Sequence, residues 1–459
     1  MIVADKYKGK NVAVFGLGKS GLSAIESLIQ AGANIFAWDD DSKIFSKLSN
    51  FDVIISNLRK LDFNDISSLV LSPGIPLNYP KPHPVVERAR DAGCEVIGDI
   101  DIFFSSNISA NIIGVTGTNG KSTTTSLITQ ILKDRSIKVQ TGGNIGTPIL
   151  SLDKMESDGS YVIEISSYQL DLLSNLNLDI AILLNIQPDH LDRHGSIENY
   201  YRIKKRIFNT KKKNTIGVIG VDDFYSEKIF NELNEKNKSI IPVSTKKKIP
   251  FGVSVLGGVL SDSRCSKTKI DINNIPNLRG NHNWQNAAAA YVVSKELGLS
   301  NNEIESSFRK FKNLPHRLES IYKDKNIEYI NDSKATNIYA TAQALKSFSS
   351  IFWILGGRTK EEKLDYLFEY LDRVEHVFTI GESGKIFAEQ LKNKVEVSFV
   401  VSLENAINKA INLIKKRKKS KSVILFSPAC SSFDQFENFE ARGEKFKEIV
   451  FKHIGNLDA

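Results

Sequence analysis

The stretch NIIGVTGTNGKSTTTSLITQIL, residues 111–132, joins an apolar run to a glycine turn and then to a helix-like segment. This order predicts a buried strand, a loop at its carboxyl end and a helix that starts at the loop. The backbone amides between Gly117 and Ser122, together with the positive end of the helix dipole, favour a bound phosphate there. A strict GxxxxGK[ST] loop needs glycine where this chain has Val115, so the loop is a variant of that motif. The stretch therefore predicts a parallel α/β domain with a triphosphate site.

The same alternation of short apolar runs and helix-like segments continues on both sides of this stretch. Upstream, NVAVFG, NIFAWD, SLVLSPG and CEVIG are typical of strands, and downstream EYINDS, SIFWILGG, HVFTIG and SVILFSPA are too. At 459 residues the chain exceeds a single core, since cores stop growing near roughly 250 to 300 residues. We predict three α/β domains: a Rossmann-like domain at 1–106, a central P-loop-type ATPase domain at 107–313 and a second Rossmann-like domain at 314–459.

The composition excludes several other classes of protein. With 41% hydrophobic and 25% charged residues, the chain is typical of an ordinary globular protein. No segment resembles a signal peptide or reaches the ~18 uninterrupted apolar residues of a membrane span, so we expect a cytoplasmic protein without membrane insertion. Cys94, Cys265 and Cys430 are widely spaced and odd in number, which favours reduced thiols over disulfides or a zinc cluster.

The formal net charge of +8 and three lysine-rich runs raise the question of nucleic-acid binding. The runs lack interleaved aromatic residues and adjoin the predicted ends of elements, where lysines are usually solvated. A diffuse positive field that attracts phosphorylated small molecules explains the charge equally well. We therefore expect small-molecule substrates, no nucleic acid and a monomeric chain.

A second glycine loop follows the first predicted strand. Gly16, Gly18 and Gly21 form GxGxxG before a helix-like segment, and Asp39 ends the next strand. This pattern is typical of nicotinamide-dependent dehydrogenases, but the glycines and the helix N-terminus only require a pyrophosphate. A UDP-sugar satisfies the same geometry, and we favour it because the rest of the chain indicates phosphoryl transfer. The remaining alternative is that the glycines only allow tight packing of strand against helix.

Two further polar residues follow apolar strands. Glu164 ends the strand in VIEISSYQLD, where a buried acid is costly unless it meets a cation, so we predict a magnesium ligand there. A helix-capping or salt-bridged glutamate is the alternative. His190 lies in NIQPDHLDRH, and although most single histidines are structural, its surroundings favour a functional role.

Several of these stretches resemble the Mur ligases and their relative folylpolyglutamate synthase. The resemblance rests on TGTNGKST, on PDHLDRH followed by YRIKKRIF, on GNHNWQNAAAA at 280–290 and on LPHRLE. It implies ATP, two Mg²⁺ ions, and a lysine carbamylated by CO₂ that holds the second ion with a histidine. We place that lysine at Lys205, not Lys204, from the register of YRxxK; an ordinary solvated lysine is the alternative. Carbamylation requires a neutral amine and hence a depressed pKa.

Three stretches resemble the branch of the family that adds D-glutamate: EISSYQLD, NDSKATN and SPACSSFDQFENFEARG. The resemblance covers all three predicted domains. It implies an amide bond between UDP-N-acetylmuramoyl-L-alanine and D-glutamate, formed through an acyl phosphate during peptidoglycan synthesis. Another Mur-type amide ligase, an NAD(P)-dependent oxidoreductase and a non-enzymatic nucleotide-binding regulator are the rival interpretations. Arg358 in LGGRTKEEK and the Asp39–Asp41 run depart from the family pattern, which leaves the contacts there open.

The resemblance also implies a role for individual residues. The ATP-binding set is Gly117, Thr118, Asn119, Gly120, Lys121, Ser122, Thr123, Asn283, Asn286, Arg317 and Asp332. The set for the UDP substrate is Gly18, Lys19, Ser20, Asp39, Asp40, Ser72, Gly74, Asn144 and His190. The D-glutamate set is Lys334, Thr336, Lys360, Ser432, Phe433 and Phe439. The metal ligands are Ser122, Glu164, His190 and carbamylated Lys205, and the catalytic residues are Lys121, His190 and Lys205.

Overall fold

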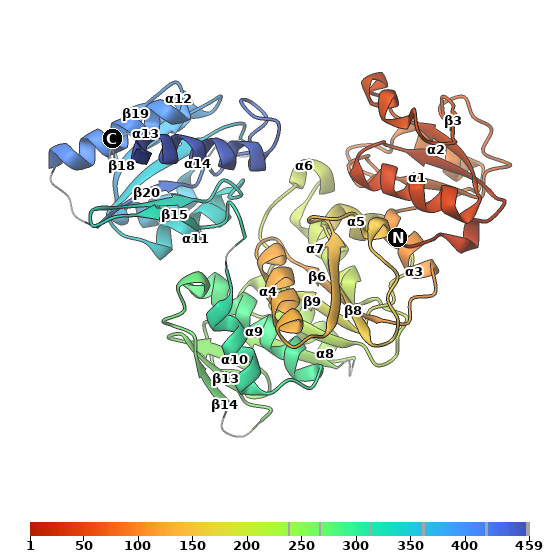
Figure 1. Cartoon of the computed structure of the whole chain (residues 1–459), viewed down its shortest axis with the longest axis horizontal. Coiled ribbons are helices and arrows are strands. Elements are labelled where there is room, and N and C mark those ends of the chain that lie inside the picture. The colour runs from red at the N-terminus through yellow and green to blue at the C-terminus, as the bar shows by residue number, and fades with distance from the viewer. Residues whose placement is uncertain (237–238, 266–267, 313, 360–362, 418–420, 456–459) are drawn as a thin grey trace. The chain divides into compact units, whose positions relative to one another are not determined.

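The computed structural model describes residues 1–236, 239–265, 268–312, 314–359, 363–417 and 421–455 (Figure 1). Within these residues the strands form three sheets. The chain divides into two compact units, Met1–Phe311 with the first two sheets and Lys312–Ala459 with the third. The three-part α/β fold expected from the sequence is confirmed, and each unit is described separately.

The first sheet has the strand order β3-β2-β1-β4-β5, and all its neighbouring strands are parallel. Its elements are β1 (Asn11–Phe15), α1 (Lys19–Ala31), β2 (Asn34–Trp38), β3 (Ile54–Ile55), β4 (Ser68–Leu71), α2 (Pro84–Asp91), β5 (Glu95–Ile97) and α3 (Asp99–Ser105). The chain order reverses between β1 and β4, and in such sheets ligands bind beyond the carboxyl ends of the strands at this point. Both the GxGxxG loop and the SPG loop start there.

The second sheet has the order β14-β13-β12-β11-β10-β9-β6-β8-β7 in the described part of the chain. Its strands are β6 (Asn111–Thr116), β7 (Lys138–Gly143), β8 (Gly159–Glu164), β9 (Ile180–Leu183), β10 (Ile216–Gly220), β11 (Ile240–Ser244), β12 (Val253–Leu256), β13 (Val259–Asp262) and β14 (Thr268–Asp271). β6 to β12 are parallel, whereas β13 and β14 add an antiparallel edge. The near-continuous apolar runs of β6, β8 and β9 are buried, as strands covered on both faces require.

The helices of this middle region position the polar residues that follow the strands. They are α4 (Lys121–Asp134), α5 (Ser167–Leu172), α6 (Leu191–His194), α7 (Ile197–Lys205), α8 (Phe224–Asn234), α9 (Asn281–Glu296) and α10 (Asn301–Lys310). α4 packs against α9, so the helix that follows the phosphate loop lies beside the helix of GNHNWQN (Figure 1).

Buried polar contacts join the first sheet's segment to the middle region within the unit Met1–Phe311. Asp101, which is 5% exposed, accepts hydrogen bonds from the backbone N–H groups of Ser174 at 3.0 Å and Asn175 at 3.1 Å. The Arg193 guanidinium donates to the Ile75 carbonyl at 3.1 Å. Because these groups are satisfied only when both segments are in place, they fix the SPG loop relative to α6.

The third sheet forms the core of the unit Lys312–Ala459 and has the order β15-β16-β20-β17-β18-β19 in the described residues. Its elements are β15 (Glu319–Lys323), β16 (Ile327–Asn331), α11 (Ile338–Ser347), β17 (Ile351–Gly356), β18 (Val374–Ile380), α12 (Gly384–Leu391), β19 (Val397–Phe399), α13 (Leu403–Arg417), β20 (Ser422–Phe426) and α14 (Phe439–Gly455). Only β15 is antiparallel to its neighbour. Across the described part of both units, no helix is both long and apolar enough to cross a membrane.

Candidate active site

The loop between β6 and α4 has the geometry of a phosphate cradle. Gly120 adopts φ +86°, a left-handed conformation that favours glycine. A Cβ atom added to Gly120 would lie 2.2 Å from Asn286 Oδ1, so packing also requires glycine there. The loop is held by Asn185, whose side-chain oxygen accepts from Asn119 N at 2.9 Å and whose backbone oxygen accepts from Thr118 N at 2.9 Å. Asn185, which lies outside the loop, therefore fixes the backbone at Thr118 and Asn119.

Two lysine side chains meet at one carbonyl of this loop. Lys121 Nζ donates to Gly117 O at 2.9 Å and to Thr118 O at 2.8 Å. Lys204 Nζ also donates to Gly117 O at 2.9 Å, from a side chain that is 1% exposed. Burial, and then the charge of Lys121, hold the pKa of Lys204 well below its usual range, while Asp189 and Glu164 act in the opposite direction. Lys204 is the buried amine of the site.

Lys205, the lysine predicted for the metal site, lies in a different environment from Lys204. Lys205 forms an ion pair with Glu232, and its side chain is 27% exposed. The helical period explains the difference in burial, because Lys204 lies on the buried face of α7 with Tyr200 and Tyr201, whereas Lys205 lies about 100° further around the helix. Lys204 Nζ lies 4.8 Å from the Tyr200 ring centroid. The period of α7 is the sequence signal that could have shown which of the two lysines is buried.

Glu164 ends β8 and is 2% exposed. Its carboxylate accepts from Ser122 Oγ at 2.5 Å and from Asn144 Nδ2 at 2.6 Å. In the described residues no three His, Cys, Asp or Glu side chains gather as a metal site. Magnesium beside a nucleotide commonly takes one or two carboxylates and completes its shell with phosphate oxygens and water. The hard oxygens of Ser122 and Glu164 fit that requirement.

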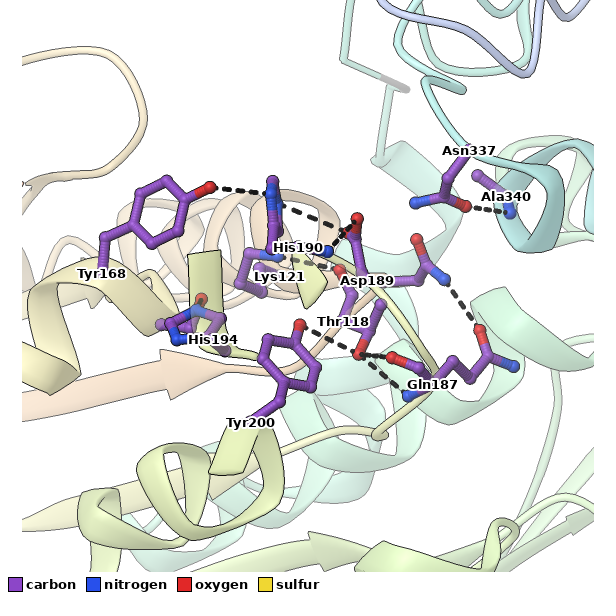
Figure 2. Close-up of polar contacts among 12 residues, drawn as sticks. Thr118, Lys121, Tyr168, Gln187, Asp189, His190, His194, Tyr200, Asn337 and Ala340 are labelled. Atoms are coloured by element: carbon purple, nitrogen blue, oxygen red, sulfur yellow. Dashed lines mark hydrogen bonds and ion pairs between the residues drawn. The ribbon is translucent and has the colours of Figure 1, made fainter. Parts of the chain in front are cut away.

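His190 is the N-cap residue directly before α6, and its backbone is left-handed, φ +55°, which is uncommon for a residue other than glycine. Its Nδ1 lies 2.9 Å from the Tyr168 hydroxyl, and its Nε2 lies 3.5 Å from Asp189 Oδ2 (Figure 2). His194 lies one turn further and is 2% exposed. Burial, and then the charge of Arg193, lower the pKa of His194 to about 3, so this imidazole is neutral near pH 7.

Thr118 links the phosphate loop to the segment that carries His190. Its hydroxyl lies 3.2 Å from the Tyr200 hydroxyl and accepts from Gln187 N at 3.0 Å (Figure 2). The other side of the loop contacts α9, where Asn286 Oδ1 accepts from Thr124 Oγ1 at 3.2 Å. Asn286 in turn donates to Asn283 Oδ1 at 3.2 Å. Of the two predicted asparagines, Asn286 therefore contacts the first turn of α4 directly, and Asn283 contacts Asn286.

The predicted UDP-binding residues of the first sheet lie after β1, β2 and β4. Asp39 accepts from Leu17 N at 2.7 Å, and Ser72 Oγ donates to Gly16 O at 2.7 Å, so both stabilise the glycine loop. Asp40 pairs with Arg59 at 2.7 Å and with His83 at 3.0 Å.

The glycines of this region have different structural roles. A Cβ at Gly21 would lie 1.9 Å from Gly16 O, so close packing explains that glycine. Gly18 and Gly74 differ, because a Cβ at either would meet no atom within 4 Å. Lys19 and Ser20 begin α1 directly after Gly18. Packing of the free protein thus does not require glycine at the mouth of this loop.

The remaining predicted residues lie in the unit Lys312–Ala459. Asp332 is buried and accepts from Ser427 Oγ at 2.8 Å, and burial raises its pKa to about 7. Lys334 Nζ lies 3.8 Å from the Phe439 ring centroid. Ser432 is buried and Phe433 is 63% exposed. Arg317 and Thr336 are half-buried. The predicted Lys360 lies outside the described residues.

Arg442 was not predicted from the sequence, and it lies buried in α14 with 1% of its surface exposed. Its guanidinium donates to Ser333 Oγ at 3.0 Å, to Ser333 O at 2.7 Å and to Cys430 O at 3.0 Å. Ser333 belongs to NDSKATN and Cys430 to SPACSSFDQFENFEARG, the two stretches that carry most of the predicted D-glutamate residues. Arg442 therefore joins two loops that are about one hundred residues apart in sequence.

The parallel sheets and the phosphate loop define a nucleotide-binding α/β protein, and comparisons with known proteins identify the family. The matching family models are the Mur ligase MurD-like N-terminal domain at residues 10–98, the Mur ligase middle domain at 115–294 and the Mur ligase glutamate ligase domain at 316–430.

Full-length relatives agree with these matches. The chain is 41% identical over 456 residues to the UDP-N-acetylmuramoylalanine--D-glutamate ligase of Nitrobacter hamburgensis, covering 98% of each chain. It is 40% identical over 469 residues to that of Phenylobacterium zucineum, covering both chains completely. This chain belongs to the Mur ligase family.

Solved structures support the fold. The UDP-N-acetylmuramate-alanine ligase MurC of Thermotoga maritima matches with a TM-score of 0.60 and 17% identity, covering 97% of this chain and 99% of that one. The MurF ligase of the same organism, in complex with ADP, matches with a TM-score of 0.58 and 18% identity over 99% and 98% of the two chains.

Proposed function

We propose that this protein uses ATP to join D-glutamate to UDP-N-acetylmuramoyl-L-alanine in peptidoglycan synthesis. The observation that carries the proposal is the 41% and 40% identity, over nearly the whole chain, to relatives named for that reaction. The phosphate loop with its two lysines supports the same chemistry. We assign the UDP end to residues 1–106, ATP to 107–313 and D-glutamate to 314–459.

The reaction needs activation because a carboxylate is a poor acceptor for an amine. Transfer of the ATP γ-phosphoryl group to the L-alanyl carboxylate gives an acyl phosphate and ADP. The D-glutamate amine then attacks the acyl carbon, and the tetrahedral intermediate collapses with loss of phosphate and a proton. We infer that the Lys121 ammonium group exchanges its hydrogen bonds to the loop carbonyls for contacts with the phosphate oxygens of ATP. Positive charge at this position stabilises the negative charge that develops in the transition state.

The metal and the modified lysine also belong to the proposal. Ser122, Glu164 and His190 would hold Mg²⁺, which neutralises phosphate charge when it is bound. We assign the carbamylated lysine to Lys204 in place of Lys205. The amine that reacts with CO₂ must be neutral, and Lys204 is the lysine whose burial and charged neighbour disfavour protonation.

Binding of a nucleotide sugar at the GxGxxG loop can be tested at Gly18. Gly18→Ala is expected to weaken UDP-sugar binding about tenfold, equivalent to ~1.4 kcal/mol, without lowering the melting temperature. The free protein has room for the added Cβ atom. A pyrophosphate bound close to the loop backbone would occupy that space, so the methyl group would push the ligand away. Calorimetric titration with UDP-N-acetylmuramoyl-L-alanine measures the effect. Gly98→Ala, at the start of α3, is the matched control, and tight NAD(P)H binding displaced by the UDP-sugar would reverse the assignment.

The choice of amino acid tests the branch of the family. D-glutamate presents two carboxylates and an amine, so a site that anchors both carboxylates cannot aim the amine of the L-isomer without leaving a charge unpaired. That cost of several kcal/mol predicts that the rate with D-glutamate exceeds the rate with L-glutamate at least ~100-fold, measured as phosphate release with each amino acid.

Ser432→Ala and Lys360→Ala should raise the KM for D-glutamate more than the KM for ATP. Ser347→Ala is the control, because its hydroxyl donates within α11 to Gln343 O. Comparable release with L-glutamate, L-alanine or diaminopimelate would contradict the assignment.

A further inference from the structure

Tyr168 is the side chain through which α5 reaches His190. α5 starts with a reciprocal cap, in which Gln169 N donates to Ser166 Oγ at 3.2 Å and Ser166 N donates to Gln169 Oε1 at 3.1 Å. Tyr168 is the second residue of the helix, and its hydroxyl lies 2.9 Å from His190 Nδ1 (Figure 2). Because the cap fixes the first turn, the backbone that carries this hydroxyl is well defined.

The ring of Tyr168 is fixed by its neighbours as well. Its centroid lies 5.1 Å from that of His190 at an interplanar angle of 63°, and 5.5 Å from that of His194. The Arg193 guanidinium carbon lies 5.4 Å from the same ring. Arg193 is itself 6% exposed and donates to the Ile75 carbonyl at 3.1 Å. These contacts leave the phenol little freedom to rotate away from His190.

The backbone of His190 is also restrained, since its N–H donates to Asp189 Oδ1 at 2.9 Å and its φ is +55°. The ring orientation still depends on what its two nitrogens meet. Nδ1 faces the Tyr168 hydroxyl, and Nε2 lies on the Asp189 side at 3.5 Å from Oδ2. The Asp189 carboxylate also favours the charged form of Lys204, the lysine that donates to the phosphate loop. Nε2 of His190 therefore lies next to a carboxylate that is electrostatically coupled to that loop.

We propose that Tyr168 is a positioning residue for His190, whose hydroxyl holds Nδ1 and thereby directs Nε2 toward Asp189 and the phosphate loop. A hydroxyl both donates and accepts, so Tyr168 can hold either neutral tautomer of His190. When Nδ1 carries the proton and donates to the Tyr168 oxygen, the lone pair of Nε2 faces the reaction site. The use of that lone pair rests on the proposed function, whereas the contact with Nδ1 is independent of it.

Tyr168→Phe is the sharpest test, because it keeps the ring and removes only the hydroxyl. In the free protein, ¹⁵N spectra of labelled histidine should show Nδ1 of His190 hydrogen-bonded, with the signal identified by its loss in His190→Gln. The variant should lose that hydrogen-bonded signature. Removing a residue that hydrogen-bonds to a metal ligand typically lowers metal affinity or activity about 10- to 100-fold. We expect kcat to fall about tenfold and Mn²⁺ affinity, followed by electron paramagnetic resonance, to fall with it, while the KM for D-glutamate changes little.

Tyr291→Phe is the matched control, since it removes a buried phenol hydroxyl that contacts Asn301 Oδ1 at 3.2 Å. It should leave the His190 signals and kcat unchanged. Wild-type His190 with Nδ1 not hydrogen-bonded, or identical His190 spectra in the wild type and a folded Tyr168→Phe variant, would overturn the proposal. Because the spectra need no substrate, a shifted His190 signal in a protein that releases no phosphate would reject the proposed function and leave the positioning role standing.

Discussion

Lys204→Ala is expected to lose about 1,000-fold in turnover, whereas Lys205→Ala keeps most of its activity. Removing one preorganised charged or polar group at a reacting centre commonly costs about 100- to 1,000-fold, and the carbamylated lysine would serve both as metal ligand and as charge. Lys205 instead pairs with Glu232 and is partly exposed, and such ion pairs contribute about 0 to 1 kcal/mol to stability. Phosphate release with saturating substrates measures both variants.

A rescue experiment separates carbamylation of Lys204 from a purely structural role. A short carboxylic acid, added to Lys204→Ala, should occupy the vacated space and restore part of the activity. Lys204→Met, which fills the space without an anion, should stay inactive and should not respond to the acid. An active Lys204→Ala variant, or an inactive but folded Lys205→Ala variant, would show that the lysine was assigned wrongly. The intact mass of the bicarbonate-treated protein provides an independent check for the added carboxylate.

Lys121→Ala should abolish turnover, by about 1,000-fold or more, with little change in melting temperature. Lys121 donates to carbonyls of its own loop, and Asn185 holds the loop backbone from outside, so we expect the cradle to remain without the lysine. What is lost is the charge that meets the transferred phosphoryl group. Lys133→Ala, at an exposed position near the end of the same helix, is the control. Substantial ligation by a folded Lys121→Ala protein would remove this lysine from the mechanism.

The parallel sheets were predictable because their strands are short apolar runs followed by glycine turns. NVAVFG and EYINDS correspond to β1 and β16, each within a residue or two at its ends. The antiparallel edge of the second sheet was missed, although VSVLGGVLSD contains the signal. Gly257 and Gly258 separate two runs with alternating apolar residues, which is typical of a two-residue hairpin. Short edge strands are easily overlooked when the search is for βα units.

The site was less predictable than the fold because its contacts depend on side-chain direction. Adjacent lysines in α7 differ by about 100° around the helix, and a motif register that is wrong by one residue exchanges a buried amine for a solvated one. Tyr168 and His190 are 22 residues apart, and Arg442 and Ser333 are 109 apart. No local periodicity encodes such pairs, since they follow only from how the strands are ordered in the sheet.

Arg442 has a consequence for any redesign of amino-acid specificity. One buried guanidinium holds the backbone of both NDSKATN and SPACSS, so neither loop can be exchanged for that of another ligase without disturbing the other. A graft that replaces a single loop would leave hydrogen-bonding groups unpaired in the interior and would misplace the untouched loop as well. The transferable module is therefore the two loops together with the first turn of α14. Directed evolution toward a new amino acid should recover paired changes in these segments more often than isolated ones.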